Sequence, residues 1–253
     1  MRLRFMLCLA TLLVLPLLFA SGVGEARAAI QWVGGTSSDV FDEGNWDLSG
    51  SGVVAIDPDM TIADDVLIGA GPFANNPEIP NEGGQVRFQL ADGNTLTIDG
   101  GTLSYVAGGN DGVGGEATAD ADISNDGING PIVNVINGGH FQPFFVTNDV
   151  RVNVDGTSSL TFGGGGNPVN NSSVNLQPGA TMTFLAETPE AFNTEHLAKI
   201  LIAGAPAVQD LNFTLAPLDA TGSVITAIVP EPSVLALLLP ALIAMVGRRK
   251  AVK

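Results

Sequence analysis

The stretch LTIDGGTLSY at residues 96–105 decides the fold class of this 253-residue chain. It alternates apolar and polar residues over Leu96–Asp99, turns at Gly100 and Gly101, and alternates again up to Tyr105. A period of two on both sides of a glycine turn is typical of two β-strands that are joined tightly. The stretch therefore predicts a strand, a glycine turn and a second strand with an aromatic residue near its end.

The same pattern recurs three times further along the chain. The copies are VNVINGGHF at 133–141, VNVDGTSSLTF at 152–162 and VNLQPGATMTF at 174–184. The turn glycines Gly100, Gly138, Gly156 and Gly179 are separated by steps of 38, 18 and 23 residues, so we expect one degenerate copy inside the first step. A unit of about 20 residues is too short to bury a core alone and has to stack on its neighbours.

Two architectures accept stacked units of this kind. In a β-solenoid, which is built like a parallel β-helix, each unit forms one coil, whereas in an antiparallel β-sandwich each unit forms a hairpin. The glycine turns recur with the same asparagines before them, which favours the solenoid because equivalent residues then stack in ladders. We therefore predict an all-β domain over residues 29–229, a β-solenoid of about eight to ten coils, with the antiparallel β-sandwich as the alternative.

One short helix is predicted near the C-terminal end of this domain. Thr188 is a good N-cap residue, and Pro189 suits the first helical position. Phe192 and Leu197 follow with helical spacing. We expect this helix to extend to Ala198 and to close the end of the stack.

Composition and charge exclude several function classes. Residues 29–229 carry 24 acidic side chains but only three basic ones, Arg87, Arg151 and Lys199, which gives a net charge of −21. Such a surface repels phosphate backbones, so we expect no nucleic-acid partner. The same range has two histidines and no cysteine, which leaves little for zinc sites or thiol chemistry. No G-x-S-x-G motif indicates a nucleophile, so we expect no enzymatic activity.

The first 28 residues have the order of a secretory signal peptide. A start with two arginines precedes an apolar run from Phe5 to Ala20, and Ala26-Arg27-Ala28 supplies a small-residue cleavage site. We assign residues 1–28 to a signal peptide and predict a secreted mature chain, which packing and backbone hydrogen bonds must hold without disulfides. A membrane anchor is the alternative, although the run is shorter than the about 20 residues of a spanning helix.

The last 24 residues, 230–253, combine three features in a fixed order. They are the non-helical triplet Pro230-Glu231-Pro232, an apolar transmembrane segment at 233–246, and a basic tail that includes Arg248 and Arg249. This order resembles the PEP-CTERM sorting signal of Gram-negative bacteria. In that family an exosortase, which is a membrane protease, recognises the Pro-Glu-Pro triplet and removes the tail.

The resemblance implies an exosortase-type protease as a partner and transient inner-membrane anchoring through residues 233–246. It also makes Pro230, Glu231, Pro232, Arg248 and Arg249 the sorting residues. Pro240 departs from a regular helix inside the apolar segment. An ordinary C-terminal anchor, which is not processed, is the alternative.

The region between the two signals resembles other secreted repeat proteins. Its glycine-turn units are similar to repeats of autotransporter passengers and of other PEP-CTERM proteins. The segments around Trp32 and Trp46, followed by Asp-Val-Leu-Ile at 65–68, resemble the opening that precedes such solenoids. We expect Trp32 and Trp46 to pack over the open end of the stack. The alternative is that both tryptophans bind a ligand as platforms for sugar rings.

The acidic loop at 110–130 is the best candidate for a metal site. Asp120, Asp122, Ser124 and Asp126 alternate ahead of a glycine, with the spacing of oxygen ligands in a calcium loop. Val133 stands where the bidentate glutamate of such a loop should fall. A solvated loop, in a protein without any cofactor, is therefore the alternative to calcium binding.

Together these features predict a secreted or cell-surface protein with a structural or adhesive role. The family resemblance implies that it works in the extracellular polysaccharide matrix of a biofilm, after passage through the inner membrane of a Gram-negative bacterium. Extracellular polysaccharide is then a second partner. The alternative is a carbohydrate-binding or carbohydrate-cleaving module, which a groove lined by aromatic residues and paired carboxylates would favour.

Overall fold

The computed structural model describes residues 29–58, 60–81, 87–106, 109, 111–115 and 130–229. Three predicted features lie outside these residues: the signal peptide at 1–28, the sorting signal at 230–253, and the calcium ligands Asp120, Asp122, Ser124 and Asp126. Within the described part of the chain, no helix has the length and apolar character needed to cross a membrane.

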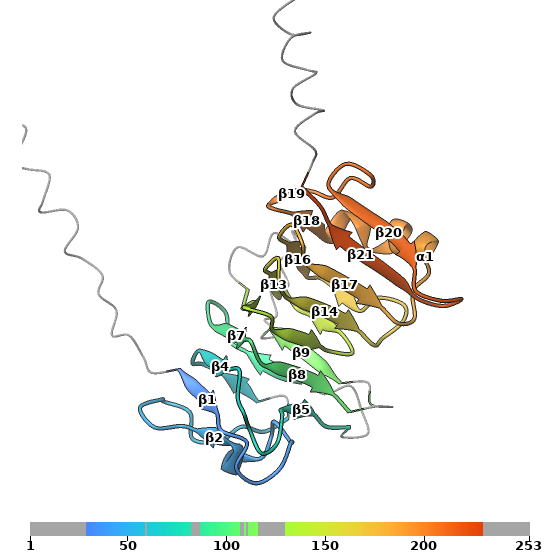
Figure 1. Cartoon of the computed structure of the whole chain (residues 1–253). Coiled ribbons are helices and arrows are strands. Elements are labelled where there is room, and N and C mark those ends of the chain that lie inside the picture. The colour runs from blue at the N-terminus through green and yellow to red at the C-terminus, as the bar shows by residue number, and fades with distance from the viewer. Residues whose placement is uncertain are drawn as a thin grey trace, which may run out of the picture.

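Strands are the main secondary structure of the described chain, and the prediction of an all-β protein is confirmed (Figure 1). They form three sheets of nine, seven and five strands, called sheets A, B and C below. Sheet A contains β1 (Ile30–Trp32), β2 (Trp46–Asp47), β4 (Val66–Ile68), β7 (Thr95–Asp99), β10 (Ile132–Ile136), β13 (Arg151–Val154), β16 (Ser173–Leu176), β18 (Ile200–Ile202) and β19 (Ala205–Pro206). Sheet B contains β5 (Glu78–Ile79), β8 (Thr102–Tyr105), β11 (His140–Gln142), β14 (Ser159–Phe162), β17 (Thr181–Phe184), β20 (Phe213–Pro217) and β21 (Ser223–Ala227). Sheet C contains β3 (Thr61–Ile62), β6 (Arg87–Leu90), β9 (Gly112–Gly115), β12 (Val146–Thr147) and β15 (Val169–Asn170).

The chain passes through the three sheets in a repeating order. From β3 to β17 it visits sheet C, then sheet A, then sheet B, and completes this pass five times. Each strand pairs in parallel with the corresponding strand of the next pass, and Figure 1 shows the passes following one another in sequence order along the stack. Among the named strands, antiparallel pairing, which the alternative sandwich requires, occurs only at the ends of sheets A and B.

Equivalent residues of the repeat stack in register. The first apolar position forms a buried ladder in sheet A, made of Leu96, Val133, Val152 and Val174. In sheet B, Phe162 pairs with Phe184, and their rings stack with centroids 5.1 Å apart. Inward residues of all three sheets belong to one hydrophobic cluster, so each pass obtains from its neighbours the core that it lacks alone.

The repeated asparagine forms a second ladder, on the outward face of sheet A. Asn134 pairs with Asn153, and Asn153 pairs with Asn175. The Asn153 amide Nδ2 donates to Asn134 Oδ1 at 3.0 Å, and the Asn175 Nδ2 donates to Asn153 Oδ1 at 3.5 Å. The repeated units of the sequence predicted ladders of equivalent residues, and these ladders are present.

Two details of the predicted repeat are wrong. The long first step holds no extra unit among the described residues, because β7 pairs directly with β10. Part of its length falls at 116–129, outside the described residues. Each pass also uses three strands instead of two, so five passes replace the eight to ten coils expected. The sequence comparison missed sheet C because strands of two residues, such as β12 and β15, are too short to show a period of two.

Trp32 and Trp46 pack together at the N-terminal end of the stack. They pair across β1 and β2 with ring centroids 5.0 Å apart, and only 2% and 6% of their surfaces are exposed. Their indole nitrogens donate to the backbone carbonyls of Asn75 and Val40 at 3.0 Å and 2.8 Å. This burial leaves neither ring a face for a sugar, so the alternative role as ligand platforms does not fit the structure.

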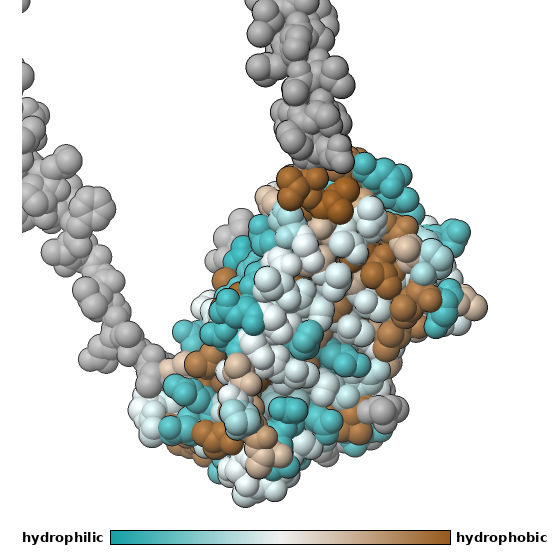
Figure 2. Space-filling model, viewed as in Figure 1, coloured by the Kyte–Doolittle hydropathy of each residue, from teal (hydrophilic) through white to brown (hydrophobic). Residues whose placement is uncertain are grey.

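A helix packs at the C-terminal end, as predicted. α1 (Pro189–Glu195) is the one α-helix in the described chain, and the Thr188 hydroxyl accepts a hydrogen bond from the Ala191 backbone N–H at 3.3 Å. The helix is shorter than predicted, because it ends at Glu195 and a 3₁₀ turn, η3 (Leu197–Lys199), follows it. The other 3₁₀ turn of the described chain is η2 (Glu43–Asn45). Figure 2 shows hydrophobic residues exposed at this end, where Leu185, Val208, Leu211, Leu218 and Val229 are exposed.

Candidate functional site

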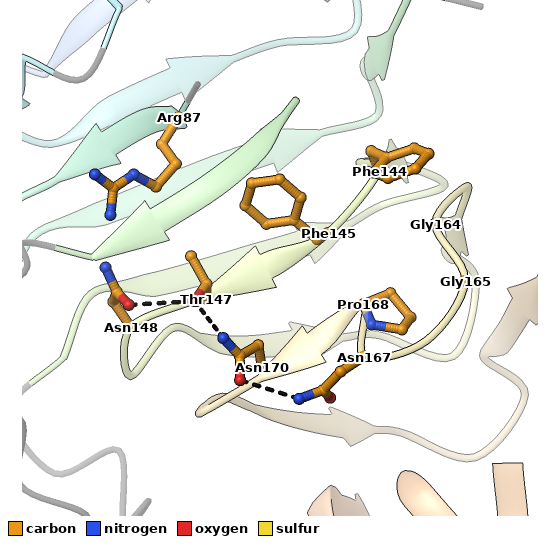
Figure 3. A pocket seen from close by; sticks show the side chains of 10 residues that line it. All are labelled: Arg87, Phe144, Phe145, Thr147, Asn148, Gly164, Gly165, Asn167, Pro168 and Asn170. Carbon is orange, nitrogen blue, oxygen red and sulfur yellow. Dashed lines mark hydrogen bonds between the residues drawn. The ribbon is translucent and has the colours of Figure 1, made fainter. Parts of the chain in front are cut away.

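A groove of about 460 Å³ lies on the outward face of sheet C (Figure 3). Its lining residues come from strands and connections of successive passes, which stack side by side. Among the described residues, the lining comprises one cation, two aromatic rings, amides and a hydroxyl, with no carboxylate: Arg87, Phe144, Phe145, Thr147, Asn148, Gly164, Gly165, Asn167, Pro168 and Asn170. The groove therefore differs from the acidic composition of the chain as a whole.

Glycines on β9 make room for two of the side chains that line the groove. Val113 of this strand is fully buried in the core, so its neighbours Gly112 and Gly114 face outward. A Cβ atom on Gly114 would lie 2.8 Å from Arg87 Cδ, and one on Gly112 would lie 2.8 Å from Phe145 Cδ2. The stem of Arg87 and the ring of Phe145 thus lie across β9 where side chains of β9 would otherwise stand.

A chain of hydrogen bonds lines the groove from β12 to β15. The Thr147 hydroxyl donates to Asn148 Oδ1 at 3.2 Å and accepts from Asn170 Nδ2 at 3.2 Å, and Asn167 Nδ2 donates to Asn170 Oδ1 at 3.0 Å (Figure 3). These bonds fix the orientation of the amides. Because each amide has two N–H donors and an oxygen with two lone pairs, the row retains hydrogen-bonding capacity for a polar ligand.

Two of the three basic residues of the range 29–229 lie at this groove. Arg87 lines it, and the Lys199 ammonium donates to Asn167 Oδ1 at 2.6 Å and to the Val169 carbonyl at 2.7 Å. Burial lowers the pKa of Lys199, and the nearby Glu195 carboxylate opposes this shift. The remaining basic residue, Arg151, lies on sheet A.

Phe144 and Phe145 give the groove half-buried aromatic surface. The Phe144 ring packs edge-on against Tyr105 with centroids 5.6 Å apart. A Cβ atom on Gly164 would lie 3.1 Å from Phe144 Cδ1, so the glycine lets the ring approach the backbone. Held aromatic surface beside oriented amides can stack against a sugar ring and bind its hydroxyl groups.

A second group of reactive side chains lies at the C-terminal end. Glu187, Glu195 and His196 each place one potential ligand atom within 4.8 Å of the other two. Glu187 and His196 are buried, whereas Glu195 is exposed. Neither ring nitrogen of His196 has a hydrogen-bond partner, which costs about 1–3 kcal/mol for a buried polar atom. These are the residues that could hold a metal ion in the described chain.

The environment of this group shifts two pKa values. Burial, and to a smaller extent the Lys199 ammonium, lower the pKa of His196 to about 4, so the imidazole is neutral at pH 7. Its ring stacks on Phe184 with centroids 5.0 Å apart. Burial raises the pKa of Glu187, and Glu195 adds to the rise, although the Gly166 backbone N–H donates to Glu187 Oε1 and opposes it.

Sequence reasoning missed both sites, for different reasons. The groove collects residues that are far apart in the chain, such as Arg87 and Asn167, and only the stacking of passes brings them together. The one local feature of the sequence that could have indicated the groove is glycine at alternate positions of Gly112–Gly115. For the second site, the signal was the adjacent pair Glu195-His196 at the end of the predicted helix.

No protein-family model, no curated protein and no solved structure matches this chain. The resemblance to PEP-CTERM proteins therefore stays a prediction from the residues that suggest it. The function proposed for this chain rests on the geometry of the groove and on the signals at the two ends of the sequence.

Proposed function

We propose that this chain is a secreted β-solenoid that serves as a structural or adhesive protein of the bacterial extracellular matrix and binds polysaccharide along sheet C. Parallel ladders in register and the repeated order of sheets C, A and B support the solenoid. The arginine, amides and aromatic rings that line the groove carry the binding role. The order of residues at 1–28 and 230–253 supports secretion and sorting by an exosortase-type protease at the cell surface.

The groove favours binding of a polysaccharide over its cleavage. Hydrolysis of a glycosidic bond uses a pair of carboxyl groups that flank the bond. The part of the groove lining that the structure describes contains no Asp or Glu, whereas it contains aromatic rings and amides that suit the faces and hydroxyl groups of sugars. This composition supports a role without enzymatic activity.

The basic residues favour an acidic polysaccharide, such as a polymer of uronic acids. The Arg87 guanidinium matches the geometry of a carboxylate, and Lys199 adds a second positive charge beside Asn167. The net charge of −21 that repels phosphate backbones opposes a polyuronate as well, but repulsion from charges more than about 8 Å away is largely screened at physiological ionic strength. Short contacts inside the groove therefore decide the preference for charge.

A binding assay with paired variants tests this role. The full chain is passed over an immobilised polyuronate and over a neutral glucan, and the dissociation constants are measured. We expect binding to the polyuronate, and a loss of about tenfold or more in Arg87→Gln, because a hydrogen bond to a charged group contributes about 1.5–3 kcal/mol. The matched control is Arg151→Gln on sheet A, which should bind as the unchanged chain does.

Three outcomes of this assay contradict the role. They are absence of binding to either polymer, equal binding by the two arginine variants, and hydrolysis of the polymer during the assay. Preference for the neutral glucan would contradict the acidic substrate class while retaining polysaccharide binding.

A separate experiment tests the sorting signal. Pro230, Glu231 and Pro232 are replaced together by alanine in a host that has an exosortase, and the mass and location of the exported chain are determined. We expect the tail to remain attached and the protein to stay at the inner membrane. Unchanged processing and export would contradict the assignment of residues 230–253 as a sorting signal.

A further inference from the structure

We propose that Glu187, Glu195 and His196 bind a divalent first-row transition-metal ion, such as Zn²⁺, at the C-terminal end of the stack. This site is separate from the groove and does not depend on polysaccharide binding. It also lies outside the segment around Asp122, where the sequence suggested calcium.

The first argument is the unsatisfied imidazole of His196. Its side chain is fully buried, and both ring nitrogens lack a hydrogen-bond partner among the described residues. A neutral imidazole has one N–H donor and one lone pair, and buried groups of this kind are nearly always paired. The aromatic neighbours Phe184 and Phe192 cannot satisfy the lone pair. A metal ion bound between His196 and the two carboxylates would satisfy it.

The second argument is the geometry of the three ligand atoms. They lie within 4.8 Å of one another, whereas ligand atoms on one tetrahedral Zn²⁺ lie about 3.3 Å apart at bond lengths of about 2.0 Å. The group therefore has to contract by about 1 Å or somewhat more. Glu195 is exposed at the end of α1 and can rotate inward, while Glu187 and His196 are packed in place.

The ligand types select the class of ion. An imidazole nitrogen with two carboxylates suits Zn²⁺ and its neighbours in the first transition row. Calcium prefers six to eight oxygen ligands, which this site does not supply. Three protein ligands leave a fourth tetrahedral position for water on the side where Glu195 meets solvent.

Neighbouring groups orient the site and set its charge. The Gly166 backbone N–H donates to Glu187 Oε1, which fixes that carboxylate and leaves its other oxygen for the ion. The Lys199 ammonium interacts electrostatically with both His196 and Glu195. Two carboxylates outweigh this single cation, so a dication reduces the local charge imbalance.

The position of the site gives the ion a structural role. Gly166 follows Gly164 and Gly165 in the wall of the groove, and Lys199 holds the neighbouring Asn167. An ion at Glu187 would therefore connect α1 to the connection that forms this wall. Metal binding should stabilise the C-terminal end of the stack.

Metal titration of the full chain tests the proposal. The protein is freed of metal with EDTA, dialysed, and titrated with ZnCl₂ in a calorimeter, and the melting temperature is recorded with and without the ion. We expect one tight Zn²⁺ site per chain and a rise in melting temperature, because an ion that binds only the folded state stabilises it. Calcium should have no matching effect. Visible spectra with Co²⁺ should show tetrahedral coordination by nitrogen and oxygen.

Four variants assign the tight site. His196→Phe and Glu195→Gln should each weaken Zn²⁺ binding by about tenfold or more. His196→Phe keeps an aromatic ring between Phe184 and Phe192, and Glu195 is exposed, so both variants should fold. Two control variants should bind Zn²⁺ as the unchanged chain does. They are His140→Phe, whose side chain is exposed on β11, and Glu190→Gln, in the first turn of α1.

The proposal is overturned by any of three results: no tight Zn²⁺ site, tight binding that survives both His196→Phe and Glu195→Gln, or equal loss of binding in His140→Phe. The last two results would assign the ion to another part of this acidic chain. None of these results bears on the polysaccharide assay, in which Arg87→Gln is the deciding variant.

Discussion

Sheets A and C are both parallel ladders, but their outward faces differ. On sheet A, Asn134, Asn153 and Asn175 place the same amide at the same position of successive passes. On sheet C, the corresponding column reads Thr61, Gln89, Gly114, Thr147 and Asn170, so the residue type changes at every step. The regular column stabilises stacking through its amide hydrogen bonds, whereas in the irregular column Gly114 has no side chain and the stem of Arg87 lies over it. In this protein, the departure from the repeat marks the candidate site.

The inward face of sheet A should give the largest loss of stability. Leu176 is fully buried in the ladder between Val154 and Ile202. Leu176→Ala should lower the free energy of unfolding by about 2–5 kcal/mol, because it removes apolar contacts and leaves a cavity. Urea unfolding followed by circular dichroism measures the change. The matched outward change Thr97→Ala should cost far less, and equal losses would contradict the assignment of the two faces.

Alanine substitutions at two glycines, Gly139 and Gly114, should distinguish a residue needed for stability from one needed for binding. A Cβ atom on Gly139 would lie 2.5 Å from the Ile98 carbonyl oxygen, so Gly139→Ala has to move backbone and should cost about 1–3 kcal/mol. A Cβ atom on Gly114 meets only the flexible stem of Arg87 at 2.8 Å and the Thr147 methyl group at 3.4 Å.

Gly114→Ala should therefore change stability by about 0.5 kcal/mol or less. It should still weaken polyuronate binding, because Arg87 has to shift. Chemical unfolding and the polymer assay, applied to both variants, measure these effects. If the folded Gly139→Ala variant binds the polymer more weakly than Gly114→Ala does, the assignment of Gly114 to the binding groove is contradicted.

Asp155 should make the turns between sheets A and B sensitive to acid. Burial raises its pKa, but hydrogen bonds from Ser158, Asn137 and Thr157 outweigh this and lower the pKa to about 2 from 3.8. The folded-state pKa lies below the unfolded value. The stabilisation is therefore fully present above about pH 4 and is lost as the pH falls toward about 2.

Asp155→Asn should lower the free energy of unfolding by about 1 kcal/mol at pH 7, a modest value because water screens this partly exposed carboxylate. The variant should also lose part of the stability change between pH 4 and pH 2. Urea midpoints measured across this range test both effects. Asp92→Asn, in an exposed turn, is the control, and identical pH profiles for the variant and the unchanged chain would refute the role of Asp155.

The outward asparagines should lose little stability and give the sharpest comparison between the two sheets. Asn153→Ala on sheet A removes two ladder hydrogen bonds and should cost about 0.5–1 kcal/mol. Asn170→Ala on sheet C also removes two hydrogen bonds and should cost about the same. Only Asn170→Ala should weaken polyuronate binding. Equal weakening in both variants would show that the polymer does not distinguish the two sheets.

The sequence predicted the repeated part of the fold well because that part is local. The alternation of apolar and polar residues at 96–99 and in its copies predicted strands of sheets A and B. Glycines such as Gly138, whose φ is 80°, predicted the turns between them. The N-cap at Thr188 produced the helix. Sheet C escaped prediction because its shortest strands have two residues, and their partners lie about 20 residues away in the chain.

The candidate sites were predicted poorly because they depend on contacts between passes. Trp32 and Trp46 were expected to pack over the end of the stack, with sugar binding as the alternative, and packing at the first pass buries both rings. Arg87 was counted only as a charge, since its place in the same groove as Phe145 requires two parallel pairings of sheet C. His196 was recognised as a helical residue, but its missing hydrogen-bond partners appear only once the helix is packed.

The sequence alone determined that this protein is rich in β-strands, is built from stacked units and is strongly acidic, because strand alternation, glycine turns and charge are local properties of the chain. The tertiary structure decided how many strands form each pass, which side chains face outward on sheet C, and which acidic residues meet His196. These features depend on register between residues distant in sequence, and register is set by how the passes stack.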